Sequence, residues 1–77
     1  MTQQINEHDM VALLHDLPEE SLLRGEIGTI VHIHNEGEAF EVEFPNPAGK
    51  PRYVVVTVRR EHLLKLRNLD LRLRPAG

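Results

Sequence analysis

Apolar and polar residues alternate in short runs along most of this chain, a pattern typical of β-strands with one buried and one exposed face. The clearest run covers residues 40–44, where apolar and acidic side chains alternate without exception. A second run covers residues 27–33 and alternates less strictly, because Ile30 interrupts it. Together the two runs predict a β-hairpin whose core face carries Val31, Ile33, Phe40, Val42 and Phe44.

Glycines mark the two ends of the first strand of this hairpin. Gly37 lies in the connection over residues 35–39, where it can adopt the positive φ that tight hairpin turns require. Gly25 and Gly28 precede or open the strand, and we expect both to let the chain turn closely at the rim of the fold. They do not form a phosphate-binding loop, because the Gly-Lys-Ser/Thr ending is missing and a strand follows instead of a helix.

Three further apolar or β-branched runs predict the remaining strands. Pro18 follows the first of these runs, residues 8–15, and ends that strand. It also allows one helical turn in the long loop that follows. A single 3-10 turn is expected over residues 59–63, before the last strand. The three runs are residues 8–15, 52–58 and 64–67. The predicted fold is therefore all-β: a small SH3-like five-stranded barrel with a long first loop and a single 3-10 turn before the last strand.

The length of 77 residues is enough for a single domain, residues 1–77. We place its core at residues 8–66 and treat residues 67–77 as a basic, alternating tail. Residues 1–7 are polar, and we expect this segment to be frayed at its start. The sequence has no cysteine, no apolar run of about 20 residues and no secretory leader pattern, which predicts a cytoplasmic protein without a membrane partner.

Charge is distributed unevenly along the chain. Residues 1–43 carry 10 of the 12 acidic side chains, whereas residues 44–77 carry 8 of the 9 basic ones. The two halves either face each other or solvate opposite faces, or the basic half meets an acidic partner. The net charge of −3 disfavours a general nucleic-acid binder, because such proteins present lysine and arginine to phosphates.

Three sequence blocks occur together and in order: Asp-Leu-Pro-Glu, Gly-x-x-Gly-Thr and Ala-Phe-Glu-Val-Glu-Phe, at residues 16–19, 25–29 and 39–44. With them, residues 8–66 resemble the bacterial family designated domain of unknown function 4926. The resemblance implies an SH3-like barrel, no catalytic activity and a role as the partner of another protein, for instance the antidote half of a toxin–antitoxin pair. The tail lies outside the usual pattern of that family.

The block Gly-x-x-Gly-Thr-Ile-Val is also loosely similar to the KOW motif of ribosomal and transcription proteins. That similarity implies an alternative function, a KOW-like nucleic-acid-binding domain that uses the basic half of the chain. Its candidate phosphate contacts are Arg59, Arg60, Lys65, Arg67, Arg72 and Arg74. Stacking of bases also needs exposed aromatic rings, and Tyr53 is the single candidate.

Two histidines of the hairpin, His32 and His34, are spaced to lie on one face of a strand. Such a pair could bind a metal if His15 or His62 supplied a further ligand. Nothing in the sequence fixes a third ligand, so we expect exposed histidines and neither a metal nor another cofactor.

Four glutamates crowd the same hairpin, on the face expected to be exposed. Carboxylates do acid–base chemistry when burial raises the pKa of one of them. On an exposed face they remain ionised, which favours a solvated or partner-facing surface. Ser21 is the single serine and has no nucleophile context. We therefore expect no catalytic residues and no enzyme activity.

The tail alternates strictly over residues 69–74, with three leucines on one face. Three interpretations stay open: a sixth strand, a disordered end, or strand addition to a partner or to a second copy, which would give a homo-oligomer.

These observations predict a non-enzymatic protein-binding module whose partner is another, unidentified protein. The predicted interface has three parts: the loop at residues 16–24, the acidic face at 36–43 and the basic segment at 59–74. The candidate partner-binding residues are Glu19, Glu20, Glu36, Glu38, Glu41, Glu43, Arg59, Arg60, Arg72 and Arg74.

Overall fold

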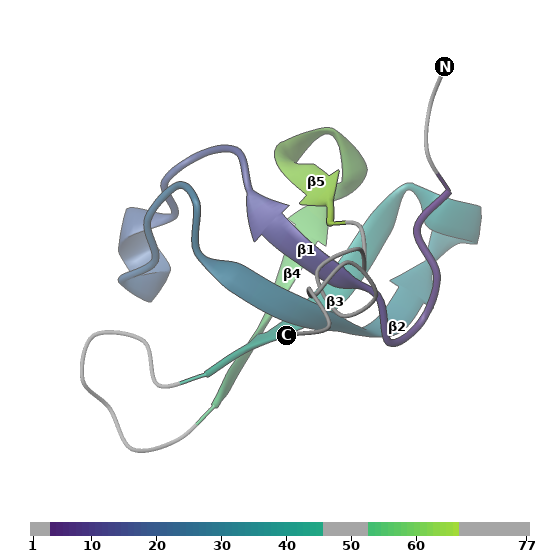
Figure 1. Cartoon of the computed structure of the whole chain (residues 1–77), viewed down its shortest axis with the longest axis horizontal. Coiled ribbons are helices and arrows are strands. Elements are labelled where there is room, and N and C mark those ends of the chain that lie inside the picture. The colour runs from purple at the N-terminus through teal and green to yellow at the C-terminus, as the bar shows by residue number, and fades with distance from the viewer. Residues whose placement is uncertain (1–3, 46–52, 67–77) are drawn as a thin grey trace, which may run out of the picture.

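Five short β-strands joined by turns make up the described part of the fold, as the alternating pattern predicts (Figure 1). The computed structural model describes residues 4–45 and 53–66. The strands are β1 (Met10–Leu13), β2 (Ile27–His34), β3 (Ala39–Phe44), β4 (Val54–Arg59) and β5 (Leu63–Lys65). Within these ranges the 3-10 turns are η1 (Pro18–Glu20), η2 (Asn35–Gly37) and η4 (Arg60–His62), so the predicted turn before the last strand is accompanied by two others. No helix in the described ranges has the length and apolar character needed to cross a membrane.

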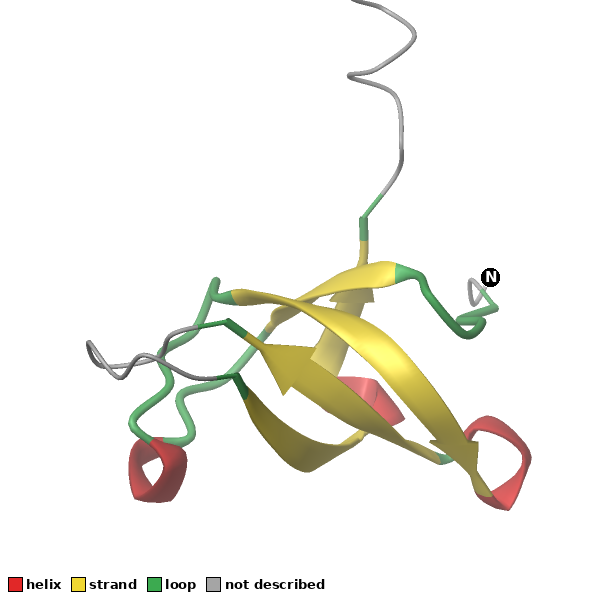
Figure 2. Cartoon of the chain, turned by 90° about the horizontal axis from the view of Figure 1, so that it is seen from below, coloured by secondary structure: helices red, strands yellow, loops and turns green. Residues whose placement is uncertain are grey.

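The strands form one antiparallel sheet in the order β4-β3-β2-β1-β5. The sheet is strongly twisted (Figure 2), and β2 is the middle strand of its order. The predicted all-β, five-stranded fold is confirmed, but in the described residues the sheet is not closed into a barrel. Strand β5 has three residues and all of its partners lie in β1, while the partners of β4 lie in β3. Among the described residues, no pairing joins the two edge strands β4 and β5.

The core lies on one face of this sheet and includes residues from all five strands. Strand β3 supplies its centre with Phe40, Val42 and Phe44, each at most 1% exposed, which confirms the predicted alternation. Two residues outside the strands, Ile5 and Leu22, complete the core from the N-terminal segment and from the loop after η1. Burial of side chains this large is the main favourable contribution to the stability of so small a domain.

The face that β2 presents to the core changes within the strand. Its pairing with β3 shifts register between Ile30 and His32, as in a β-bulge. A bulge adds one residue to one strand, so the positions that face the core change from even to odd numbers. Ile30 is therefore fully buried, whereas Val31 is 39% exposed. The predicted core position of Val31 is wrong, while Ile33, beyond the bulge, packs against the core as predicted.

The two glycines before and within β2 have different roles. Gly25 has φ +94° and makes the predicted turn into the strand. Gly28 does not turn the chain: it lies inside β2 and is buried. A Cβ at this position would approach Val42 Cγ1 to 2.6 Å, the Glu43 carbonyl oxygen to 2.8 Å and Phe44 Cδ1 to 2.9 Å. Only a glycine therefore allows β2 and β3 to approach this closely over the core.

The bulge predicts opposite outcomes for two adjacent truncations. Ile30→Ala should lower the free energy of unfolding by about 2 to 5 kcal/mol, because it opens a cavity in the core. Val31→Ala should change it by less than about 1 kcal/mol, because that side chain is half in solvent. Urea unfolding followed by far-UV circular dichroism measures both. If Ile30→Ala does not fold, Ile30→Val provides the comparison, with an expected loss of about 0.5 to 1.5 kcal/mol. A larger loss at Val31 than at Ile30 would contradict the bulge.

The close approach at Gly28 predicts that Gly28→Ala destabilises the domain by about 1 to 3 kcal/mol or more, because the nearest atoms include backbone. Val55→Ala, at an exposed position of strand β4, is the control, with an expected change below about 1 kcal/mol. Thermal unfolding of both variants gives the comparison, and equal midpoints would argue against the packing role of Gly28.

Candidate functional site

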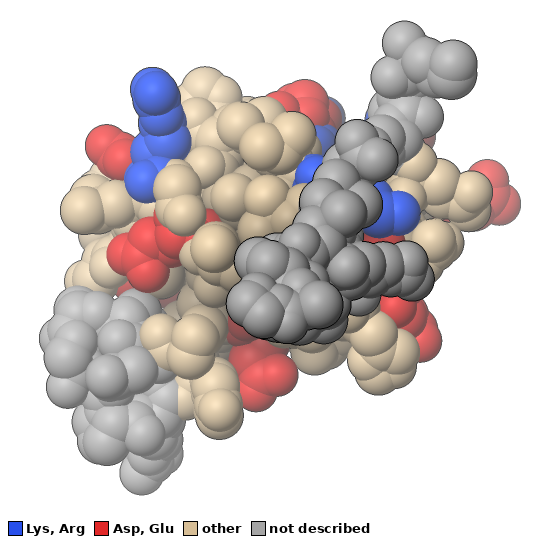
Figure 3. Space-filling model, viewed as in Figure 1, with Lys and Arg blue, Asp and Glu red and all other residues tan. Residues whose placement is uncertain are grey.

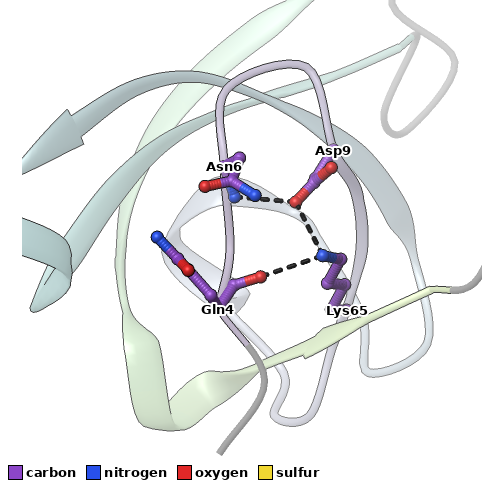
Figure 4. Close-up of polar contacts among 4 residues, drawn as sticks. All are labelled: Gln4, Asn6, Asp9 and Lys65. Atoms are coloured by element: carbon purple, nitrogen blue, oxygen red, sulfur yellow. Dashed lines mark hydrogen bonds and ion pairs between the residues drawn. The ribbon is translucent and has the colours of Figure 1, made fainter.

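The N-terminal segment is fixed to the sheet by a small polar network, which we call the N-terminal clasp: Gln4, Asn6, Asp9 and Lys65 (Figure 4). Lys65 Nζ donates to the Gln4 carbonyl oxygen at 2.9 Å and lies 3.3 Å from the Asp9 carboxylate. Asp9 also accepts a hydrogen bond from the Asn6 backbone N–H at 2.7 Å. Ile5, at 7% exposure, packs in the core, while the start of the chain that is expected to be frayed lies outside the described residues.

Gln4 and Asn6 of the clasp, together with neighbouring residues, border an open hollow of about 580 Å³. One wall is the N-terminal segment, and the others come from η2 and from the start of η4. Apolar side chains of the core reach its lining, while charged side chains lie beside them. The residues that matter chemically are Ile5, Ile33, Phe40, Glu36, Glu38 and Arg60.

Tight backbone geometry places the two glutamates of the hollow. Asn35, Glu36 and Gly37 all have positive φ, at 49°, 58° and 98°. The predicted positive φ of Gly37 is confirmed, and the two preceding residues adopt the same left-handed region at a cost of about 1 kcal/mol or more each. Two hydrogen bonds hold the turn: the Glu38 N–H donates to the His34 carbonyl at 3.2 Å, and the Arg60 N–H donates to the Glu38 carbonyl at 3.0 Å. The second bond ties the hairpin tip to η4.

The outer face of the sheet carries the histidines and the other two hairpin glutamates. His34 Nε2 lies 3.1 Å from the Glu41 carboxylate, and His32 is directly opposite Glu41 in the register of β2 and β3. The rings of His32 and His34 meet edge to face with centroids 4.6 Å apart, so both lie on one face as predicted. In the described part of the chain, no group of three or more His, Cys, Asp or Glu could hold a metal ion. Glu43 lies opposite Val55 of β4, an exposed apolar residue. A charged side chain and an apolar one are therefore neighbours on this surface.

The structure brings together three of the ten candidate residues at the hollow: Glu36, Glu38 and Arg60. Glu19 and Glu20 are exposed on η1, which lies at the opposite end of the sheet from η2 (Figures 1 and 2). On the face seen in Figure 3, visible acidic side chains lie at several separate places. In the described residues the acidic and basic parts of the predicted interface therefore meet at the hollow, while the loop part lies apart from them. Arg72 and Arg74 lie outside those residues.

Sequence reasoning missed the contribution of the N-terminal segment to the hollow. The available signal was Ile5, a lone apolar residue among polar neighbours, followed by an Asn-Glu-His-Asp run typical of a turn. His8 in that run has φ +74°, and the Asp9 N–H donates to the Asn6 carbonyl at 3.1 Å.

Arg59, another candidate, is occupied by an ion pair on the surface. Its Nε donates to the Glu61 carboxylate at 3.0 Å. The pKa of Glu61 is lowered from its ordinary value, first by a hydrogen bond from its own backbone N–H and then by the Arg59 guanidinium. A lowered pKa in the folded state means that the associated stability is present above the unfolded pKa and is lost as the pH falls through the folded pKa.

Removing Arg59 should therefore raise the pKa of Glu61 toward its ordinary value without restoring it fully, because the backbone hydrogen bond remains. A titration followed by NMR on the Glu61 side-chain carboxyl carbon measures the shift in Arg59→Ala. The neighbouring change Arg60→Ala should leave that pKa unchanged, so an equal rise in both variants would refute the specific pairing.

Comparison with known proteins identifies the family of this chain. Searches among curated proteins and among solved structures gave no match. A match to a protein family covers residues 7–65, which include all five strands and end where β5 ends. The family resemblance noted in the sequence is thereby confirmed. The chain belongs to the family described as Domain of unknown function (DUF4926).

Proposed function

We propose that this chain is a non-enzymatic protein-binding module that serves another bacterial protein in the cytoplasm as an accessory partner or as the antidote of a toxin–antitoxin-like pair. The observation that carries this proposal is the hollow, where apolar core side chains lie beside two carboxylates and one guanidinium. Interfaces between proteins often have such centres, with apolar contact area beside a few charged groups that fix orientation.

The chemistry of the hollow favours a lysine or arginine side chain from the partner. Its aliphatic stem would lie on the partly buried Ile33 while its cation meets Glu36 or Glu38. Arg60 offers the opposite charge at the same site and suits a partner carbonyl or carboxylate next to that cation. The hollow thus fits a partner surface that is basic with an adjacent acceptor.

The outer face supports the same choice of partner. Glu41 and Glu43 lie on it, and the chain as a whole carries a net charge of −3. Negative charge spread over a face accelerates encounter with a basic partner. In an antidote, this face would cover a basic active site by presenting carboxylates where that site expects phosphates.

The alternative, a KOW-like nucleic-acid-binding domain, receives less support. Arg59 and Lys65, two of its candidate phosphate contacts, are engaged with Glu61 and Asp9. Contacting a phosphate would require breaking these pairs or sharing the cation with a carboxylate.

A pull-down with matched charge variants tests the proposed function. The full chain is used as bait in lysate of the source organism, beside Glu36→Gln/Glu38→Gln and the control Glu19→Gln/Glu20→Gln. Both variants lose two negative charges, but only the first pair lines the hollow. The unchanged chain and the control should retain the same partner, and the hollow variant should bind it about tenfold more weakly, equivalent to ~1.4 kcal/mol.

Affinities for the identified partner are then measured by calorimetry. Equal or tighter binding by the hollow variant would contradict the assignment of the hollow. A salt-dependent gel shift with nucleic acid, in the absence of a retained protein, would favour the KOW-like alternative.

A further inference from the structure

The outer face of the sheet carries neighbouring apolar side chains on β5, β1 and β2, which we call the outer patch: Met10, Ala12, Ile27 and Leu64. The register places them side by side, because Ala12 lies opposite both Ile27 and Leu64. Met10, Ile27 and Leu64 are 48%, 47% and 49% exposed. Single exposed apolar side chains are common on protein surfaces, but a group that continues over three adjacent strands is typical of an interaction site.

The side chains of the outer patch point away from the core. In β1, Val11 and Leu13 are buried, so the alternation of a strand puts Met10 and Ala12 on the opposite face. The Thr29 hydroxyl donates to Met10 Sδ at 3.6 Å, which places the outward side chains of β1 and β2 on the same side of the sheet. The outer patch shares no residue with the lining of the hollow and is a separate surface.

The charges on β3 beside the outer patch are acidic. Glu43 lies opposite Thr29, and Glu41 points to the same face because it alternates with the buried residues of β3. Arg59 of β4 also lies on this face, but its Nε donates to the Glu61 carboxylate at 3.0 Å. Docking of a second copy on this face would bring carboxylates toward carboxylates, whereas a basic partner would be attracted to them. Charge complementarity therefore favours a basic partner.

The distance between the apolar and the acidic part of this face fits one side of an α-helix. Met10 and Glu43 both lie opposite Thr29, so they share one row across the sheet. Neighbouring strands are about 4.8 Å apart, which puts Met10 and Glu43 roughly 10 Å from each other. About seven helical residues span the same length and return to the same side of the helix. A helix laid along this row therefore places an apolar side chain at position i on Met10 and a lysine or arginine at i+7 on Glu43.

We propose that the outer patch, together with Glu43 and Glu41, binds an amphipathic basic helix of the partner protein. This inference rests on the proposed function and names the segment of the partner that the outer face receives. Apolar side chains of the helix lie over Met10, Ala12 and Ile27, and its cations meet the two carboxylates. Apolar contact area supplies affinity, while the carboxylates fix the direction of the helix.

A synthetic peptide of leucine and lysine tests this assignment without the cellular partner. The probe has leucine at i, i+3 and i+4 and lysine at i+7, and the control peptide has glutamate in place of every lysine. Titration of the full chain is followed by the NMR shifts of its backbone amides. The lysine peptide should shift the signals of Ala12, Ile27 and Glu43 more than those of Glu36 and Arg60 at the hollow. The glutamate peptide should bind at least about tenfold more weakly, because like charges meet at β3.

Two matched double variants test the residues themselves. Ile27→Thr/Glu43→Gln changes the outer face, and Leu23→Thr/Glu20→Gln is the control. Each variant loses one exposed apolar side chain and one negative charge, but Leu23 and Glu20 lie outside the sheet. Calorimetry should show binding of the lysine peptide about tenfold weaker in the first variant and unchanged in the control. If circular dichroism shows that the first variant is unfolded, Glu43→Gln alone should weaken binding by about threefold.

Several outcomes would overturn the inference. These are larger shifts at the hollow than at the outer patch, equal affinity for the two peptides, or equal losses of affinity in the two double variants. A dimer of the unchanged chain in light scattering, dissociated by Ile27→Thr/Glu43→Gln, would assign the patch to a second copy.

Failure of this inference can be distinguished from failure of the proposed function. A cellular partner that the hollow variant binds more weakly, with no lysine peptide bound at the outer patch, would refute the helix site and leave the proposed function standing. Peptide binding at the outer patch, with no partner retained by the full chain in lysate, would support the helix site and contradict the proposed function.

Discussion

The fold depends on one strand, β2. This strand must pair with two neighbours while the positions that face the core change from even to odd numbers along it. Its first half pairs with β1, and its pairing with β3 continues to the hairpin tip. The bulge between Ile30 and His32 reconciles these demands, because it bends the strand and keeps an apolar residue over the core on each side. Gly28 completes the arrangement by letting β3 approach without a Cβ between them.

This constraint also decides what the outer face contains. Without the bulge, Val31 and Ile33 would share one face and His32 would share the other with Ile30. With it, Ile30 and Ile33 enter the core, and His32 joins His34 and Glu41 outside. The mixed surface that we assign to partner binding is thus a consequence of how a small core is filled.

Much of the fold could be predicted from local sequence, because strand periodicity, proline and glycine act over a few residues. The alternation around Phe40, the turn at Gly37 and the turn before β5 are examples. The facing of Val31 could not be predicted, because a bulge is a property of the pairing with β3; the irregular Ile30 was its one trace in the sequence. The predicted closure into a barrel is wrong for a related reason, because strand partners such as β1 and β5 lie far apart in the chain and local sequence does not determine their pairing.

The sequence identified several of the charged residues of the candidate site, but it did not predict how they are arranged around the hollow. Acidic residues of the hairpin and Arg60 were recognised as exposed and charged, yet their position around one hollow depends on Ile5 and on the clasp. Glu19 and Glu20 looked equivalent to them in sequence and lie at the other end of the sheet. Charge counts along a chain cannot separate such groups, because the topology decides which of them meet.

The N-terminal clasp has a consequence for the order in which the molecule is built. Lys65 reaches the Gln4 carbonyl across a separation of 61 residues, and β5 pairs with β1 across nearly the same distance in sequence. Contacts this distant form slowly, since loop-closure entropy must be overcome first. On the ribosome, β1 to β4 can emerge before their last partner exists. One wall of the hollow then stays unfixed until β5 arrives, so a chain still under synthesis cannot present the finished hollow to another protein.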